Sequence, residues 1–594
     1  MQRNKVNVKV WRRIAAGLAA ALMLFTLVSC QINEPTNTPT GPAPTVENDP
    51  TQGENTLPQP PDGDQGVLGG ETPAFPEEDK PTPPPNPEIS LLQHSSQEYD
   101  TACLGCTKIT VLSEYVKGLD HDVVSIKDGT NKVFSLYLPC RVDLSCLTFN
   151  VTHRDGSVSG PYTANFLDDE ITENESVIGG VSNYAIRVHQ SNLPSIMLNI
   201  DESYVTIGQL NGDKEHKTFA YGDMFLTVTD QMARSNGWAT RYVSLDENAD
   251  KYCSMDIRGR GNASWKSDKK PYQIRTENSL NLLGMGHADT WALLANYNDA
   301  TGVRTQLAME LGLLLEYDYT SAYQPVDLFM NGKYLGLYTL IEKIEVGPNR
   351  VEIDESVDVL YEVDQYYLEQ GIYGFATTDT PNSDLRRFRI HAPEVPELVD
   401  RSKQILITAE NALYSGNEDE FLKYFDLESW AKSYIINCYT MNSDAYYGSF
   451  YFYYDDSDGK MHACSPWDFD WSLGISFSQG NNIDPMRYDI TKRVWMKPMM
   501  KYQSFQWALM ELYYEDGAKQ IVESMPNIAR LMGTYGQLSG DMNFKAVPNR
   551  IYPETALSYD ASLEYLYSIC DARVLYMELH MQNIALDVGY PNFY

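Results

Sequence analysis

The sequence has little positive charge for its length. Its 594 residues include 46 lysines and arginines against 81 aspartates and glutamates, which gives a formal net charge of −35. A chain this acidic does not attract nucleic acid through its overall electrostatic field, so we expect no nucleic-acid partner. The same charge suits divalent cations or a basic protein partner, and it also favours solubility outside the cell.

Long apolar runs are missing after the N-terminus. No run beyond residue 29 approaches the roughly 18 apolar residues that a membrane-spanning helix needs. The N-terminus itself joins a basic segment, MQRNKVNVKVWRR, to the short apolar segment IAAGLAAALMLFTLV and then Ser29. This arrangement is typical of a secretory signal peptide, so we predict an exported protein with residues 1–29 as its signal.

The predicted cleavage site adds a lipid anchor to this prediction. The residues LVSC, which end at Cys30, resemble the lipobox of bacterial lipoproteins, in which the cysteine is acylated and becomes the mature N-terminus. The resemblance implies lipidation of Cys30 and attachment to the extracytoplasmic face of the cell membrane by lipid alone. A plain secretion signal is the alternative.

Cysteine and histidine, two common metal ligands, are scarce, with nine of each. Two cysteine pairs are closely spaced, Cys103 with Cys106 and Cys140 with Cys146. Disulfides or unpaired thiols suit an exported chain, and a zinc site is the alternative. Among the histidines, His462 shows no metal-ligand spacing with any partner.

Composition divides the remaining chain into three parts. Residues 30–98 are rich in proline, threonine and asparagine and have too few apolar groups to fold, which predicts an extended linker. Residues 99–195 alternate apolar and polar positions between turn residues, which predicts a small all-β sandwich without candidate catalytic groups. In residues 196–594 strands come first and helices later, which indicates an α+β domain.

Four elements of the α+β domain are clear from the sequence. GVRTQLAMELGLLLEY has the periodicity of a helix. PVDLFMNGKYLGLYTLIEKI predicts a β-hairpin with its turn at Asn331-Gly332, the strongest short turn signal. DEFLKYFDLESWAKSYIINCYTM predicts one more helix, and a second hairpin follows with its turn at Asp456–Gly459.

The segment SPWDFDWSLG, residues 465–474, follows this second hairpin and carries two carboxylates. On a strand, Asp468 and Asp470 would lie on one face. Asp444 lies 24 residues before Asp468, and Ser449 lies five residues after Asp444. Protein kinases have a similar order, in which one carboxylate orients the attacking hydroxyl and a later Asp-Phe holds Mg²⁺ against the phosphates. We interpret Asp470 as a turn carboxylate of lesser importance.

A glycine-rich segment lies upstream in the order that this chemistry requires. RGRGNASW, residues 258–265, places small residues between two predicted strands, where backbone N–H groups can approach a phosphate. Lys269 and Lys270 follow on the next predicted strand, where a phosphate-binding lysine is expected. On the predicted helix, Arg304 and Glu310 are six residues apart and do not share one face, so we expect each to pair elsewhere.

Taken together, these blocks resemble the CotH kinase family, which is named for the spore coat protein H. The matching segments are RGRGNASWKSDKKPYQIR, LLGMGHADTWALLANYNDATGVRTQLAMELG, VDLFMNGKYLGLYTLIEKIEVGPNRVEI, NSDAYYGSFYFYYD and PWDFDWSLG. The resemblance covers residues of about 196 to 580. It implies an atypical protein-kinase-like fold and Mg²⁺-dependent transfer of the ATP γ-phosphate to serine or threonine of a protein substrate.

The resemblance also implies roles for individual residues. Asp444 would be catalytic and Asp468 would bind the metal, with Ser449 as a further ligand where many family members have asparagine. The residues implied to bind the nucleotide are Lys270, Arg258, Arg304 and Glu342.

Other functions remain open at this stage. A non-catalytic surface protein with a degenerate kinase fold could bind protein or glycan, and the scarcity of extracellular ATP and the presence of Ser449 favour it. A glycoside hydrolase that uses Asp468 would leave the glycine-rich segment and the lysines without a role. A related enzyme could instead transfer AMP on the same fold.

Overall fold

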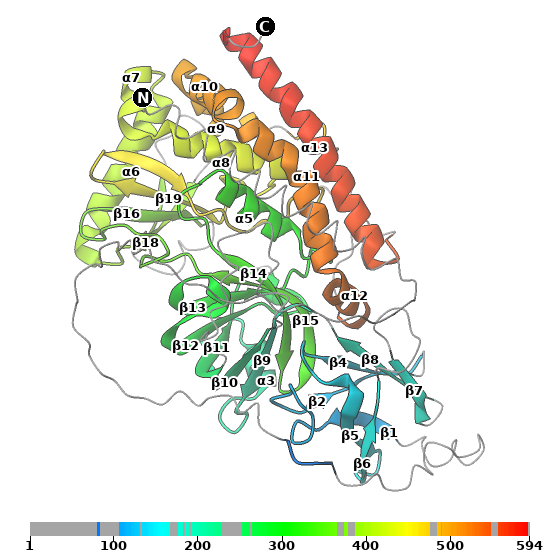
Figure 1. Cartoon of the computed structure of the whole chain (residues 1–594). Helices are drawn as coiled ribbons and strands as arrows, with labels where there is room; N and C mark the ends of the chain where they lie inside the picture. The colour runs from blue at the N-terminus through cyan, green and yellow to red at the C-terminus, as the bar shows by residue number, and fades with distance from the viewer. Residues whose placement is uncertain are drawn as a thin grey trace, which may run out of the picture.

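The computed structural model describes residues 80–83, 106–130, 133–166, 176–181, 184–190, 192–228, 252–261, 264–364, 373–377, 386–475, 484–488, 490–492, 494–547 and 556–591. Cys30, Cys103, the predicted signal peptide and nearly all of the predicted linker lie outside these residues. Strands fill the first part of the described chain and helices the last part (Figure 1), which confirms the α+β class.

The N-terminal strands form two four-stranded sheets, in the orders β2-β1-β5-β6 and β3-β4-β8-β7. Ile109 and Phe149 from the first sheet and Phe134 and Ile186 from the second belong to one hydrophobic cluster. The strands are β1 (Cys106–Val111), β2 (Val123–Val124), β3 (Ile126–Asp128), β4 (Val133–Leu138), β5 (Leu147–His153), β6 (Val158–Ala164), β7 (Ser176–Val181) and β8 (Tyr184–Gln190).

The next seven strands close into a barrel in the order β10-β11-β12-β13-β15-β14-β9. The β14–β15 hairpin turns at Asn331 and Gly332, whose φ angles of 45° and 74° confirm the predicted two-residue turn. The strands are β9 (Ser195–Ile200), β10 (Ala220–Thr227), β11 (Tyr252–Gly259), β12 (Tyr272–Asn281), β13 (His287–Leu294), β14 (Tyr323–Met330) and β15 (Lys333–Glu342).

A five-stranded sheet, in the order β17-β18-β16-β19-β20, lies among the C-terminal helices. Its strands are β16 (Val359–Val363), β17 (Gly374–Thr377), β18 (Arg386–Ala392), β19 (Phe450–Asp455) and β20 (Lys460–Cys464). The helices are α5 (Arg304–Leu314), α6 (Val399–Tyr414), α7 (Glu418–Tyr424), α8 (Leu427–Thr440), α9 (Met496–Met499), α10 (Gln503–Met510), α11 (Ala518–Tyr535), α12 (Gln537–Ala546) and α13 (Tyr559–Val588).

Helix α5, which the sequence predicted, connects the barrel to these helices. It contacts β14 on one side and α8 and α11 on the others, as Figure 1 shows. Its side chains are buried along nearly its whole length. Movement of the barrel relative to the helices would therefore disturb a shared core rather than a solvated gap.

The helix predicted over residues 419–441 is two helices, and that prediction was wrong. Helix α7 ends at Tyr424, and α8 begins after Asp426. The Asp426 carboxylate accepts a hydrogen bond from the backbone N–H of Ser429 at 2.8 Å. This side-chain cap starts a new helix at a position that apolar periodicity alone does not reveal.

The seven cysteines in the described residues form no disulfide with one another. Cys140 is buried and its Sγ donates to the carbonyl of Thr227, whereas Cys146 is exposed. In this part of the chain, no helix is long and apolar enough to cross a membrane.

The two N-terminal sheets pack against the barrel. Tyr334 on β15 stacks on Tyr137 of β4, with ring centroids 4.9 Å apart. Tyr334, Phe329 and Met197 from the barrel belong to the same hydrophobic cluster as the sheets, and Met542 from α12 joins them. The N-terminal sheets and the barrel therefore share one packed core.

This shared core predicts the result of a pair of substitutions. Tyr334 is 2% exposed, so Tyr334→Ala should lower the free energy of unfolding by about 3–5 kcal/mol through loss of buried surface and a cavity. Tyr221→Ala on β10, where the side chain is 58% exposed, should change it by less than about 0.5 kcal/mol. Urea denaturation measures both, and equal effects would show that the interface contributes nothing.

Candidate active site

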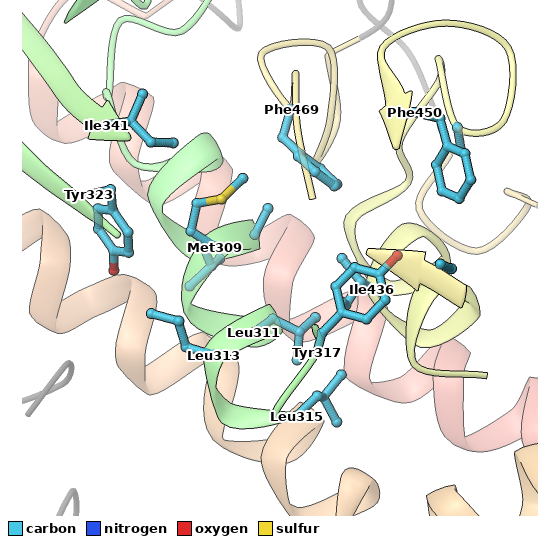
Figure 2. Close-up of a cluster of buried hydrophobic side chains, with 14 of the residues drawn as sticks. Met309, Leu311, Leu313, Leu315, Tyr317, Tyr323, Ile341, Ile436, Phe450 and Phe469 are labelled. Atoms are coloured by element: carbon cyan, nitrogen blue, oxygen red, sulfur yellow. The ribbon is translucent and has the colours of Figure 1, made fainter. Parts of the chain in front are cut away.

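The segment SPWDFDWSLG is a loop after β20, so the strand considered for it was wrong. Phe469 is 1% exposed, and Figure 2 shows its ring pointing into the hydrophobic cluster that contains Met309 of α5, Ile436 of α8 and Phe450 of β19. Asp468, just before it, has a left-handed φ of 64°. The buried phenylalanine thus fixes the loop while the aspartate before it stays exposed.

Asp470 is held more tightly than a turn carboxylate, contrary to our interpretation of the sequence. Asn298 donates a hydrogen bond from Nδ2 to Asp470 Oδ2 at 2.9 Å. Oδ1 is buried and has no hydrogen-bond partner among the described residues. Burial raises the pKa of Asp470 to about 8, and the charges of Asp468, Asp444 and Asp299 act in the same direction. The site therefore lacks positive charge at this oxygen.

Asp444 is brought to the same place by the end of α8. The helix ends at Met441 in the left-handed conformation, and the side chain of Asn442 accepts a hydrogen bond from Asp444 N at 3.0 Å. Ser443 then donates from both N and Oγ to the carbonyl of Trp471, at 3.3 and 3.0 Å. Two segments that are far apart in sequence are thus joined beside Asp470.

Arg304 binds a carboxylate of the protein rather than facing an open space. It is 1% exposed, its Nη1 lies 2.5 Å from Asp299 Oδ1, and its Nε donates to the carbonyl of Leu473 at 3.2 Å. Asp299 in turn accepts from the backbone N–H of Arg304 at the start of α5. Arg304 therefore connects the start of α5 to the loop that follows Asp470. Glu310 pairs elsewhere as expected, with the hydroxyl of Tyr323.

Lys270 and Arg258 form hydrogen bonds with groups other than the carboxylates of the segment. Lys270 Nζ donates to the carbonyl of Trp265 at 2.6 Å, within its own loop. Arg258 Nη2 donates to Gln273 Oε1 at 3.1 Å on the neighbouring strand. Neither side chain is brought to Asp468 by the contacts that hold it.

Arg260, which the sequence did not single out, is the cation that does face Asp468. Its guanidinium lies 5.4 Å from the ring centroid of Trp467. Burial lowers the pKa of Arg260, and the charges of Asp468 and Glu362 oppose that shift. The signal was present in the segment RGRG, where two arginines alternate and the sequence does not show which one lies near Asp468.

Glu362 is a second residue that the sequence did not reveal. It lies on β16 directly opposite Tyr451 on β19, whose hydroxyl is hydrogen-bonded to it, and its side chain is 12% exposed. Burial raises the pKa of Glu362 to about 7, and the charges of Asp364 and Asp468 add to the shift. No motif marks this glutamate, because its place depends on strand pairing between distant segments.

The two remaining predicted residues lie at the edge of the site. Glu342 is 6% exposed and its Oε2 accepts a hydrogen bond from Ala322 N at 2.6 Å, so it closes the end of the β14–β15 pair. Ser449, with φ of 49°, lines a small pocket together with Trp467 and Phe469. Ser449 is therefore near the segment SPWDFDWSLG, whereas the carboxylate of Glu342 binds the backbone N–H of Ala322.

A separate group of possible metal ligands lies on the β19–β20 hairpin. Asp455, Asp458 and His462 place ligand atoms within 4.8 Å of one another. The expectation that His462 has no such partner was wrong, because the tight turn brings His462 Nε2 to within 3.2 Å of Asp458 Oδ2. Asp444, Asp468 and Asp470 do not form an equally tight group in the part of the chain that the structure describes.

The carboxylates around Phe469 nevertheless suit Mg²⁺ and a phosphate chain together. Mg²⁺ in phosphoryl-transfer sites is usually bound by one or two carboxylates, with water and substrate phosphates completing its shell. Asp468 and Asp470 would supply the carboxylates, and the buried Oδ1 of Asp470 would gain the partner that it lacks. Arg260 would supply positive charge beside them.

Comparison with known proteins gives one match. The family model described as CotH kinase protein matches residues 257–565, a range that includes Arg260, Asp444 and the whole segment SPWDFDWSLG. No curated protein matches the chain.

The lysine next to Lys270 generates a prediction about stability. Lys269 is 3% exposed and donates to Leu337 O at 2.7 Å and to Asn543 Oδ1 at 2.9 Å. Burial lowers its pKa from 10.5 to about 7, so between these values the unfolded chain binds more protons than the folded one. The contribution of Lys269 to the free energy of unfolding should therefore rise from pH 7 to pH 9, by at most about 1.4 kcal/mol per pH unit, while Asp470, whose pKa burial raises to about 8, contributes in the opposite direction.

Lys269→Met should remove this rise, whereas Lys266→Met, at an exposed position in the same loop, should keep it. Urea denaturation at pH 7, 8 and 9 measures the slope in the three proteins. A slope that is unchanged in Lys269→Met would contradict the assignment of the buried ammonium.

Proposed function

The chain belongs to the CotH kinase family, and we propose that it is a surface-anchored atypical protein kinase. It transfers the γ-phosphate of ATP to serine or threonine hydroxyls of a protein substrate and depends on Mg²⁺. The observation that carries this proposal is the buried, unpartnered oxygen of Asp470 within a group of carboxylates. Such a carboxyl is stabilised either by a proton or by a bound cation, and membership of a kinase family favours the cation.

Each residue of the chain has a defined task in this reaction. Bound Mg²⁺ supplies positive charge to the phosphate groups as negative charge develops on them. Asp468 and Asp470 hold the metal, and Asn298 keeps the Asp470 carboxylate oriented through its hydrogen bond. Asp444 accepts the proton of the attacking hydroxyl and orients that hydroxyl towards the phosphorus.

Side-chain contacts connect the elements that carry the carboxylates of the site, which favours catalysis over loose binding. Arg304 and Asp299 connect α5 to the loop after Asp470, and Ser443 connects that loop to Asp444. Preorganised charges of this kind need no rearrangement when the transition state forms, which is the basis of electrostatic catalysis. A protein that only displays a binding surface gains nothing from a buried carboxylate without a partner.

Three substitutions test this mechanism. Asp468→Asn and Asp470→Asn should each abolish Mg²⁺-dependent ATP binding or lower it severely, because each removes a charged metal ligand. Asp444→Asn should keep ATP binding and lower phosphotransfer by a factor on the order of 10²–10³. Calorimetric titration with Mg²⁺-ATP and transfer of labelled phosphate to a generic basic protein measure the two effects.

Asp458→Asn provides the matched control, because Asp458 belongs to the hairpin group and not to the proposed site. It should bind ATP like the wild type. If all four folded variants bind and transfer like the wild type, the kinase mechanism is wrong and a non-catalytic surface protein is the better account.

The proposed location has its own test. If Cys30 carries lipid, Cys30→Ser should release the protein from the membrane fraction or block its processing. Cell fractionation and the mass of the mature N-terminus measure this. Unchanged membrane retention with normal cleavage would refute the lipid anchor without affecting the proposed reaction.

A further inference from the structure

Arg260 occupies a loop whose backbone is fixed on both sides. It follows the last residue of β11, and its N–H donates to the carbonyl of Pro271 at 3.3 Å. The ring of Trp265 packs against Gly259, where an added Cβ would lie 2.4 Å from the ring. Gly261 has a φ of +81°, a conformation that glycine adopts without strain. The backbone therefore presents Arg260 at one defined position.

The side chain of Arg260 reaches across to the elements that carry the proposed site. Its guanidinium lies against Trp467, which precedes Asp468 in the loop after β20. Its electrostatic partners come from three further positions, Asp468 in that loop, Glu362 on β16 and Tyr451 on β19. Arg260 thus connects the barrel to the five-stranded sheet beside the carboxylates of the proposed site.

The donors of Arg260 are not used by the protein. A guanidinium has five N–H donors, and the guanidinium of Arg260 forms no hydrogen bond and no ion pair with the described residues, although the residue is largely buried. The arginines near it differ, since Arg304 binds Asp299 and Arg258 binds Gln273. N–H groups that are partly removed from water and lack a hydrogen-bond partner raise the free energy of the folded protein unless an anion binds them.

The neighbouring carboxylates, Glu362 and Asp468, do not form hydrogen bonds with the N–H groups of Arg260. Glu362 is already hydrogen-bonded to Tyr451 and lies 3.6 Å from His391 Nδ1. Asp468 lies beside Arg260 without forming an ion pair with it. An arginine that served only to neutralise these acids would be expected within 4 Å of one of them.

We propose that Arg260 binds the phosphate chain of the nucleotide, an inference that rests on the proposed kinase function. A phosphate group beside Asp468 would accept hydrogen bonds from the guanidinium, and Asp468 and Asp470 would hold the Mg²⁺ that accompanies the nucleotide. The planar fork of arginine suits two phosphate oxygens at once, which a lysine ammonium cannot match. The cation–π contact with Trp467 helps to hold the guanidinium beside the loop that carries Asp468.

The test compares affinity for a ligand with phosphates and one without. Arg260→Gln should weaken Mg²⁺-ATP binding by about 10- to 100-fold, the effect of losing a charge-assisted hydrogen bond, and should leave the affinity for adenosine unchanged. Arg260→Lys should give an intermediate affinity. Arg275→Gln is the matched control, because Arg275 lies on the next strand, is paired with Asp256 and is 55% exposed. Its affinity for both ligands should equal that of the wild type.

The outcomes separate this inference from the function on which it rests. If the wild type binds no Mg²⁺-ATP, the proposed function fails and Arg260 has no phosphate to bind. If the wild type binds Mg²⁺-ATP but Arg260→Gln binds it equally well, the role of Arg260 is wrong and the proposed function stands. Stronger loss in Lys270→Gln than in Arg260→Gln would return the role to the lysine, and equal loss of adenosine and ATP would indicate damage to the fold.

Discussion

Burial of one side chain, that of Phe469, determines where the charged groups of the site lie. Complete burial of a phenylalanine contributes roughly 1.5–3 kcal/mol, and here the ring packs into the cluster shared by α5, α8 and β19. Its two flanking carboxylates cannot enter that cluster, so Asp468 stays at the surface and Asp470 meets Asn298. The hydrophobic core therefore sets the geometry of a polar site.

The electrostatic balance of the site follows from this arrangement. Four acids, Asp299, Asp444, Asp468 and Asp470, interact around the loop, and Arg304 compensates Asp299 alone through a close ion pair. Asp470 keeps one buried oxygen without a hydrogen-bond partner among the described residues. In the proposed function, bound Mg²⁺ would reduce this excess of negative charge, and the phosphate chain of the nucleotide would accept hydrogen bonds from Arg260. Metal and nucleotide should therefore bind together more strongly than either does alone.

The sequence predicted those features that depend on neighbours along the chain. The turn at Asn331-Gly332 and the α5 helix follow from local preference, and the CotH resemblance led to the site as a whole. It did not predict which cation faces the carboxylates, because the alternation of Arg258 and Arg260 only acquires meaning when β11 is placed in the barrel. Nor did it reveal Glu362, whose role arises from pairing with β19 across almost 90 residues of chain. Asp470 was underestimated because burial, unlike residue spacing, cannot be read from a short motif.

The central claim is that Asp468 and Asp470 hold the metal that binds the nucleotide. A crystal of the protein grown with Mn²⁺ and a non-hydrolysable ATP analogue, measured for anomalous scattering of manganese, tests it most directly. The account predicts a manganese peak bonded to both carboxylates and to phosphate oxygens, with Arg260 contacting the same phosphate chain. A peak only at Asp455, Asp458 and His462, with no nucleotide beside Phe469, would contradict it.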